Sequence, residues 1–450
     1  MRRLPAWIEP WFAAFYLANL VMGTSSILIP LKLDRVLDLG PSHLGLLSSV
    51  TSIAAVVGSL VWGRLSDAVH RRKAFVVLSY LIVGISHWGL AMSTSFLGLM
   101  LHNAVLSLFW VANASVAVLL VIEGADPRAW ESHISALNLS GAIGWLSGLV
   151  LGGGVVSTAV GLLTDRIGIQ VLLLGLGGTA MLAAGLAGWL LPGTPLRFTD
   201  RRFRGIMIAV GNLLLEVWRF NPLHLYHRFS LRRLPALRRE TRAFLVASFL
   251  AFAGIGFFAV PLALLLSQRL GFSSSTVFFS YVLLHSGIVL AYPFALRRIR
   301  RRGNRKVQIG ALSVRLVLLV VGGAALWVGT PIPWTATALF LFLIGMTWSF
   351  FQLSGVAFAS RLAAPENRGL ALGTYNAVAG TSTILAGVTS GYVAERFGHQ
   401  ATYIAAAALL LAAVILLAQL RDPPVLAMVE RSSGFPLAPR GEQVPPQAEA

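Results

Sequence analysis

One short segment combines residue types that could do chemistry. The run Gly63-Arg64-Leu65-Ser66-Asp67-Ala68-Val69-His70-Arg71-Arg72-Lys73 separates two long apolar stretches. Its basic residues, Arg71, Arg72 and Lys73 among them, are typical of a cytoplasmic loop, but a carboxylate contributes little to membrane orientation. Asp67 suits a reversible contact with a cation or with the positive N-terminal end of a helix, and Gly63 permits a close backbone approach. The segment predicts a gate contact that exists in only one conformation; a merely solvated loop is the alternative.

The elements that must position this loop cross a membrane. Of the 450 residues, 56% are hydrophobic and 12% charged, and the mean hydropathy is +0.76. A run of roughly 20 apolar residues crosses the roughly 30 Å hydrocarbon layer. The pattern predicts an all-α membrane protein of about twelve spans: Trp11–Leu31, Ser42–Trp62, Ala74–Ser93, Phe96–Ile122, His133–Val160, Ile169–Leu191, Arg242–Leu266, Ser274–Leu296, Val307–Gly329, Trp334–Ser360, Leu370–Ala394 and Gln400–Leu420.

The distribution of basic residues predicts the orientation. With both termini inside, thirty of the 36 Lys and Arg residues fall in inner segments and five in outer loops. Cytoplasmic segments of membrane proteins carry such an excess. We therefore expect a multi-pass protein of the cell membrane with both termini in the cytoplasm. The net charge of +19 is explained in this way, and nucleic-acid binding is not expected.

The two halves of the chain repeat one another. Gly40-Pro41-Ser42-His43 enters the second span as Gly271-Phe272-Ser273-Ser274 enters the eighth, and Asp165-Arg166-Ile167-Gly168 matches Glu395-Arg396-Phe397-Gly398. We predict two copies of a six-helix unit, residues 1–192 and 242–420. They are joined by a basic cytoplasmic connector, 193–241, and followed by a disordered cytoplasmic tail, 421–450. Apolar residues three and four apart in the connector, from Phe203 to Trp218, suggest a helix on the inner membrane face, with a simple tether as the alternative.

Together these features resemble the major facilitator superfamily of secondary transporters. The resemblance covers roughly residues 11–420, and it implies that Asp67 contacts the start of the eleventh span, near Arg368 and Gly369, in the outward-facing state. Departures exist: His70 stands where the family usually has Gly. The fifth-span motif of proton-driven antiporters is only partial, because Leu149 replaces its proline.

Polar residues within the spans are the candidates for substrate contact, because an unpaired polar group in hydrocarbon costs free energy. The resemblance places a central cavity among these helices. The candidates are Asn19, Trp110, Asn113, Asn138, His285, Trp348, Gln352 and Asn376. Helix packing is the competing role for each of them.

Three further residues stand inside the spans. Arg315 lies close enough to the inner end of its helix for its side chain to snorkel to the surface, which we favour over a buried pairing. His102 and His285 suit proton transfer, but a hydrogen-bonding role in the core is the more common one. No Asp or Glu lies deep in a span, which weakens an argument for proton coupling.

Enzyme classes find no support. The chain has no Cys, its only Lys residues are Lys32, Lys73 and Lys306, and a phosphate-binding Gly-x-x-x-x-Gly-Lys loop does not occur. Neither a cofactor nor a metal is expected. The function expected first is secondary active transport of a small organic solute by alternating access, as a proton-coupled exporter of amphipathic compounds acting as a monomer. Uptake of a sugar or metabolite, and a non-transporting receptor or scaffold on the same fold, are the alternatives.

Overall fold

A computed structural model describes residues 9–69, 72–124, 130–162, 164–191, 239–328, 331–362 and 368–420. Within these ranges the chain is helical, with short turns between helices and no strand. The helices are α1 (Phe12–Arg35), α2 (Pro41–Val69), α3 (Arg72–Met92), α4 (Phe96–Gly124), α5 (Trp130–Leu162), α6 (Asp165–Leu190), α9 (Arg239–Ala259), α10 (Leu262–Leu264), the π-helix η3 (Leu265–Arg269), α11 (Ser274–Arg302), α12 (Asn304–Val328), α13 (Trp334–Leu362), α14 (Arg368–Phe397) and α15 (His399–Gln419).

Within the described ranges, twelve segments are long and apolar enough to cross a membrane, as the sequence predicted. The seventh is not one helix. α9 ends at Ala259, and the span continues through α10 and η3. Pro261 lacks the backbone N–H that a continuous helix would need. The predicted span Arg242–Leu266 is thus present, but it is built from three helical segments.

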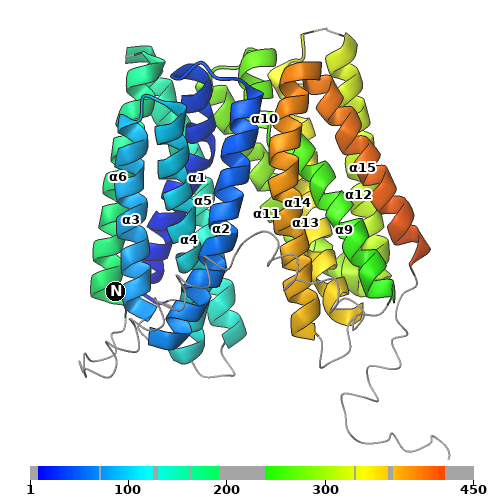
Figure 1. Ribbon diagram of the computed structural model, residues 1–450, viewed down its shortest axis with the longest axis horizontal. Coiled ribbons are helices and arrows are strands. Elements are labelled where there is room, and N and C mark those ends of the chain that lie inside the picture. The colour runs from blue at the N-terminus through cyan, green and yellow to red at the C-terminus, as the bar shows by residue number, and fades with distance from the viewer. Residues whose placement is uncertain are drawn as a thin grey trace, which may run out of the picture.

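The chain folds into two helical bundles that stand side by side (Figure 1). In the first bundle α1 packs on α5 and α6, α2 on α4, and α3 on α4 and α6. In the second, α9 packs on α14 and α15, α11 on α13, and α12 on α13 and α15. Each contact in one bundle has its counterpart six spans later. The packing therefore repeats in the way that the sequence repeats.

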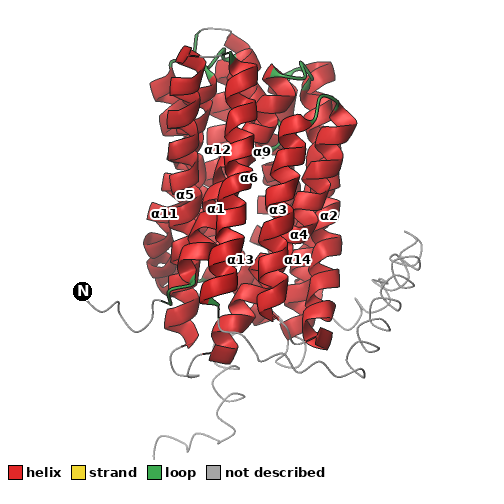
Figure 2. Cartoon of the chain, turned by 90° about the vertical axis from the view of Figure 1, so that its left-hand side faces the viewer, coloured by secondary structure: helices red, strands yellow, loops and turns green. Residues whose placement is uncertain are grey.

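Among the described residues, two helix pairs make most of the contact between the bundles, α2 with α14 and α5 with α11, and α1 adds smaller contacts with α10, η3 and α11. The helices run roughly parallel to one another in both views (Figure 2). We call the end that carries the turns after α1, η3 and α14 the closed end, and the opposite end, where the described chain starts, the terminal end. The helices of the two bundles approach each other at the closed end and stand further apart at the terminal end (Figure 1).

Glycines shape two of the turns. Gly303 separates α11 from α12 with φ +78°, and Gly398 separates α14 from α15 with φ +83°. Residues other than glycine rarely adopt this backbone conformation. These glycines end one helix and start the next within a single residue.

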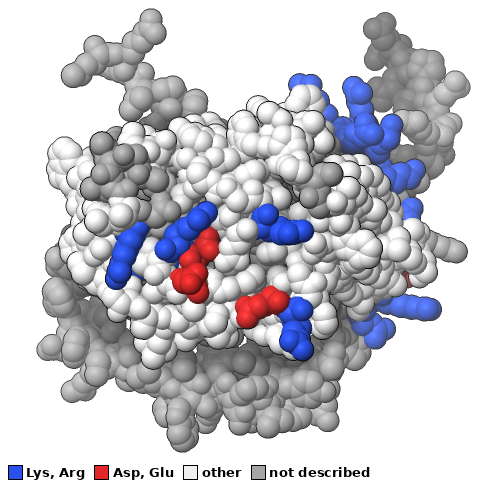
Figure 3. Space-filling view, turned by 90° about the horizontal axis from the view of Figure 1, so that it is seen from above, with Lys and Arg blue, Asp and Glu red and all other residues white. Residues whose placement is uncertain are grey.

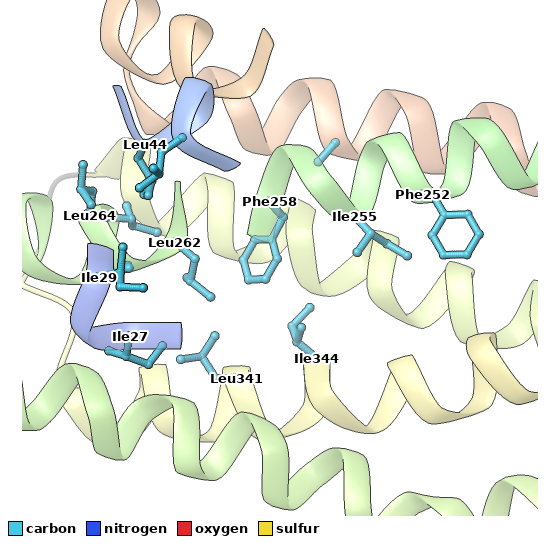
Figure 4. Packing of buried hydrophobic residues seen from close by; sticks show 14 of the residues in the cluster. Ile27, Ile29, Leu44, Phe252, Ile255, Phe258, Leu262, Leu264, Leu341 and Ile344 are labelled. Atoms are coloured by element: carbon cyan, nitrogen blue, oxygen red, sulfur yellow. The ribbon is translucent and has the colours of Figure 1, made fainter. Parts of the chain in front are cut away.

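Buried aliphatic and aromatic side chains fill the space between helices at the closed end. Ile27 and Ile29 of α1 lie near Leu262 and Leu264 of α10, and Leu341 of α13 lies beside them (Figure 4). The outer surface is also apolar, and Trp189, for example, is 80% exposed. An exposed apolar surface of this extent requires hydrocarbon as its solvent. The protein is therefore an integral multi-pass membrane protein.

Candidate substrate site and gate

The predicted gate loop is described only in part. The structure describes only the backbone of Gly63 and Asp67 and does not describe Arg71. The role of Asp67 therefore stays a prediction. Arg72 and Lys73 begin α3. Lys73 donates from Nζ to the Leu191 carbonyl, 2.7 Å away. Lys73 therefore ties α3 to the end of α6 within one bundle and is not free to bridge the two.

At the closed end, polar contacts between the bundles begin at the end of α1. Gln268 of η3 donates from Nε2 to Asp34 Oδ1 at 2.7 Å. Arg35 donates from one guanidinium nitrogen to the Phe272 carbonyl at 3.1 Å. Viewed from above, the closed end is mostly uncharged, with a few acidic groups beside basic ones (Figure 3). A small number of polar contacts therefore joins the bundles at this surface.

Glu395, at the end of α14, makes a further contact with the other bundle. Its Oε2 accepts a hydrogen bond from the Ser42 backbone N–H at 2.9 Å. Ser42 lies in the first turn of α2, where backbone N–H groups have no partner within the helix and the dipole favours an anion. A Cβ at Gly40 would lie 2.7 Å from the same carboxylate oxygen, so Gly40 leaves the room that Glu395 needs.

Below this contact, α2 and α14 touch backbone to backbone. A Cβ at Gly45 would lie 2.3 Å from the Gly387 carbonyl oxygen, and one at Gly391 would lie 2.4 Å from the Pro41 oxygen. Ser49 then donates to the Ile384 carbonyl at 2.6 Å. Close approach of the backbones and hydrogen bonds at Ser42 and Ser49 hold the two helices together.

The pair α5 and α11 meets in a similar way. Gly152 and Gly153 of α5 face Phe278: a Cβ at Gly152 would lie 2.7 Å from its ring, and one at Gly153 would lie 3.0 Å from its Cβ. Nearer mid-depth, the Trp145 ring of α5 lies 6.1 Å from the His285 ring of α11. Among the described residues, the cross-bundle contacts thus run from the closed end to about the middle of the helices.

The candidates in the first bundle take different positions. Asn19 donates to the Phe15 carbonyl of its own helix at 2.8 Å and lies against α5 at Gly141. Asn113 is fully buried and accepts a bond from the Tyr80 hydroxyl at 2.6 Å. Both contacts belong to helix packing. Trp110 is half-buried, and Asn138 is exposed.

The candidates in the second bundle lie on three helices, α11, α13 and α14. Trp348 is half-buried, with its ring 6.4 Å from that of Phe252. Gln352 lies one turn further along α13, and its Oε1 is buried without a partner. His285 bonds the Tyr281 carbonyl at 2.9 Å through Nδ1. Asn376 is exposed.

Trp145 was missed by the sequence analysis. Its Nε1 is buried without a partner, and its ring faces His285 across the two bundles. A signal was present, because Trp145 stands between Gly144 and Gly148, whose missing side chains let α5 approach α1 at Tyr16 and Leu20. Trp145 and His285 bring the two bundles together at mid-depth.

Arg315 does not snorkel to the surface, so that expectation was wrong. Its side chain is 4% exposed. Nε donates to Thr347 Oγ1 at 2.8 Å, and a terminal nitrogen donates to the Ile344 carbonyl at 2.7 Å. These acceptors lie in the middle of α13, at the depth where hydrocarbon surrounds the bundle. Bonds to α13 therefore give the guanidinium its acceptors without the side chain having to extend to water. His102 bonds the Gly98 carbonyl at 2.8 Å, the core role expected of it.

Two pseudo-repeated six-helix bundles, joined by two equivalent helix pairs, define the architecture of a membrane transporter. The family model of the Major Facilitator Superfamily matches residues 11–352 and, in a second match, 244–443. The chain belongs to this family.

Known proteins with similar sequence or fold are transporters. The uncharacterized MFS-type transporter YhhS of Salmonella typhi is 30% identical over 186 residues, 41% of this chain. The chain thus spans 43% of the length of that relative. The nucleoside transporter NupG has the same fold, with a TM-score of 0.69 at 17% identity over 92% of this chain and 99% of that one. The inward open conformation of the xylose transporter XylE from E. coli gives 0.67 at 13% identity, over 92% and 96%.

Proposed function

We propose that the protein carries a small organic solute across the cell membrane by alternating access, and that the structure represents its inward-facing state. The observation that carries this proposal is the distribution of contacts between the bundles. They run from the closed end to mid-depth and rest on close glycine contacts and single hydrogen bonds. Each bundle also has internal packing of its own. Such an interface can separate while both bundles stay folded.

The orientation follows from the excess of basic residues in the predicted inner segments, which supports cytoplasmic termini. The terminal end then faces the cytoplasm, and the closed end faces outward. In the opposite state, Asp67 is proposed to contact the start of α14, with Arg71 and Arg72 beside it. That contact would hold the cytoplasmic ends together.

The residues at mid-depth support an uncharged or weakly charged solute. Trp145 offers a free donor, Gln352 a free acceptor, and Trp348, Tyr281 and His285 offer ring faces. None of these side chains is a carboxylate or a strong base. An amphipathic compound with an aromatic or apolar face fits this chemistry, and proton-coupled export is the direction we propose.

Uptake of a neutral polar metabolite is the second candidate. It is favoured by the solved structures of similar fold, whose names give a nucleoside and xylose as cargo. A non-transporting receptor on the same fold is the third reading. Measured solute flux separates it from both transport hypotheses.

The test starts with the purified protein. A thermal-shift screen of amphipathic aromatic compounds, nucleosides and sugars identifies a solute that raises the melting temperature, and flux of that solute is then measured in proteoliposomes. We expect Trp348→Ala and Gln352→Leu to weaken binding at least tenfold, and Trp189→Ala, on the exposed outer surface, to leave it unchanged. Binding without flux under any ion gradient would identify a receptor, and flux that requires ATP would refute the proposal.

A further inference from the structure

A buried histidine that the sequence analysis did not weigh lies between α1 and α3. His87 is 0% exposed and Ser25 is 1% exposed. His87 Nε2 lies 2.5 Å from Ser25 Oγ, and its Nδ1 lies 2.7 Å from the Val83 carbonyl oxygen. Ser25 Oγ in turn lies 2.6 Å from the Val21 carbonyl oxygen.

These three contacts need more protons than a neutral imidazole supplies. Carbonyl oxygens only accept, so Nδ1 must carry a hydrogen for Val83, and the single hydroxyl hydrogen of Ser25 must point at Val21. Nε2 then faces a hydroxyl oxygen that has no hydrogen left to give. It completes the third bond only by donating a hydrogen of its own. An imidazole that donates from both nitrogens is an imidazolium.

We propose that His87 and Ser25 form a proton-binding site within the first bundle. With the proton bound, all three hydrogen bonds are made. Without it, the Ser25 hydroxyl can donate either to His87 or to Val21, and the other contact places two lone pairs against each other. The proposal concerns the transporter's coupling ion, and it rests on the proposed function only for the use made of the proton.

The surroundings make this proton exchangeable. Three basic groups are brought to this end of α3: Lys32 from α1, Arg166 from α6, and His102, which stands against Gly89, from α4. The carboxylate of Asp34, also on α1, bonds Gln268 in the other bundle. Full burial and positive neighbours disfavour an imidazolium, whereas its hydrogen bonds to Val83 and Ser25 favour it. Opposed effects of this kind allow a site to bind and release a proton.

A small polar pocket lies between this site and the closed end. It has a volume of about 110 Å³, and its lining includes Lys32, Ala91, Ser93 and Arg166. Ala91 is one helical turn beyond His87, and its carbonyl accepts from Lys32 Nζ at 3.0 Å. The pocket has room for about three waters at ~30 Å³ each. Water there would bring a proton to within one turn of His87.

Helix α1 links the site to the contacts that shut the closed end. Ser25 bonds a carbonyl of its own helix, and Pro30 interrupts the hydrogen-bond ladder one turn further on. The helix then ends at Asp34 and Arg35, which contact the other bundle. All three bonds are in place in this structure, whose closed end is shut, so we expect a bound proton to favour that state.

The direct test is the protonation state of His87 in the full-length protein, measured by magnetic resonance with nitrogen-15-labelled histidine in lipid nanodiscs. The chain has nine His residues, and the signal lost in His87→Gln assigns the one of interest. We expect both nitrogens of His87 to be protonated at about pH 7, where a free imidazole is largely neutral. Ser25→Ala should make His87 neutral, while His102→Gln should leave it charged. A neutral His87 from about pH 5 to 8, or no change in Ser25→Ala, would overturn the proposal.

A second measurement tests the link between His87 and opening of the closed end. A cysteine in place of Ser49, which is 2% exposed, reports opening of the closed end through maleimide labelling. Its rate, normalised to that of the exposed Ser95→Cys at each pH, should rise from about pH 6 to 8. The rise should vanish in His87→Gln, whose amide donates permanently. Neither measurement requires a known solute, so failure of the proposed transport function would show separately as absence of flux. A charged His87 with pH-independent labelling would overturn the link between the bound proton and the closed end.

Discussion

Removing the charge of Glu395 should open the closed end. In Glu395→Gln the residue keeps its shape but loses the negative charge that faces the first turn of α2, 2.9 Å from the Ser42 nitrogen. The interaction of an exposed anion with a helix N-terminus stabilises by about 0.3–1 kcal/mol. Because the contact joins the two bundles, this free energy is lost only from the state that is shut at this end. The population with an open closed end should therefore rise about two- to fivefold.

Maleimide labelling of Ser49→Cys measures this shift, since the side chain becomes accessible when α2 leaves α14. The chain has no Cys of its own, so the reporter is unique. Asp38→Asn is the matched control. Asp38 is an exposed carboxylate in the turn between α1 and α2, and Asn tolerates its φ of +51°. An unchanged rate in Glu395→Gln, or an equal rise in Asp38→Asn, would refute the reasoning.

Three other predictions concern topology and stability. An impermeant maleimide added from outside should label Pro331→Cys but not Arg301→Cys, although both positions are exposed; inverted labelling would reverse the orientation. Lys32→Met should lower stability by about 1–3 kcal/mol, because the last carbonyls of α3 lose their charged donor, while Arg301→Met should not shift thermal melting. Arg315→Lys and Thr347→Val should each lower the melting temperature, and the double variant should fall by less than their sum, because both remove one bond; full additivity would show that they do not interact.

The spans were predictable because hydrocarbon demands about 20 apolar residues for each crossing. The expected fourth span, Phe96–Ile122, differs from α4 by two residues at one end. The break after α9 did not follow from Pro261 alone, because Pro30 and Pro293 lie inside unbroken helices of the same chain. Whether a helix breaks there depends on the packing of α10 against α1, which joins residues more than two hundred positions apart.

The surroundings of the candidate residues could not be read from the sequence for a related reason. The polar character of Asn113 and Asn138 was visible in the sequence, but their surroundings were not: one is buried against Tyr80 and the other is exposed. Trp145 was overlooked although Gly144 and Gly148 flank it, because these glycines point to the contact of α5 with α1 and not to a partner in the other bundle. Its pairing with His285 arises from the relative placement of two bundles, and the helical period within either bundle does not encode that placement.

The contact between Glu395 and Ser42 has a consequence for how this sequence can change. Glu395, near the end of α14, accepts a hydrogen bond at the start of α2. Asp67, near the other end of α2, is expected to meet the start of α14. The same two helices would then carry one carboxylate latch at each end, about 38 Å apart at 1.5 Å per residue, and only one latch would be engaged at a time. A variant that weakens one latch should be rescued by a variant that weakens the other. Second-site suppressors of Glu395→Gln are therefore expected in the loop around Asp67, on the opposite side of the membrane.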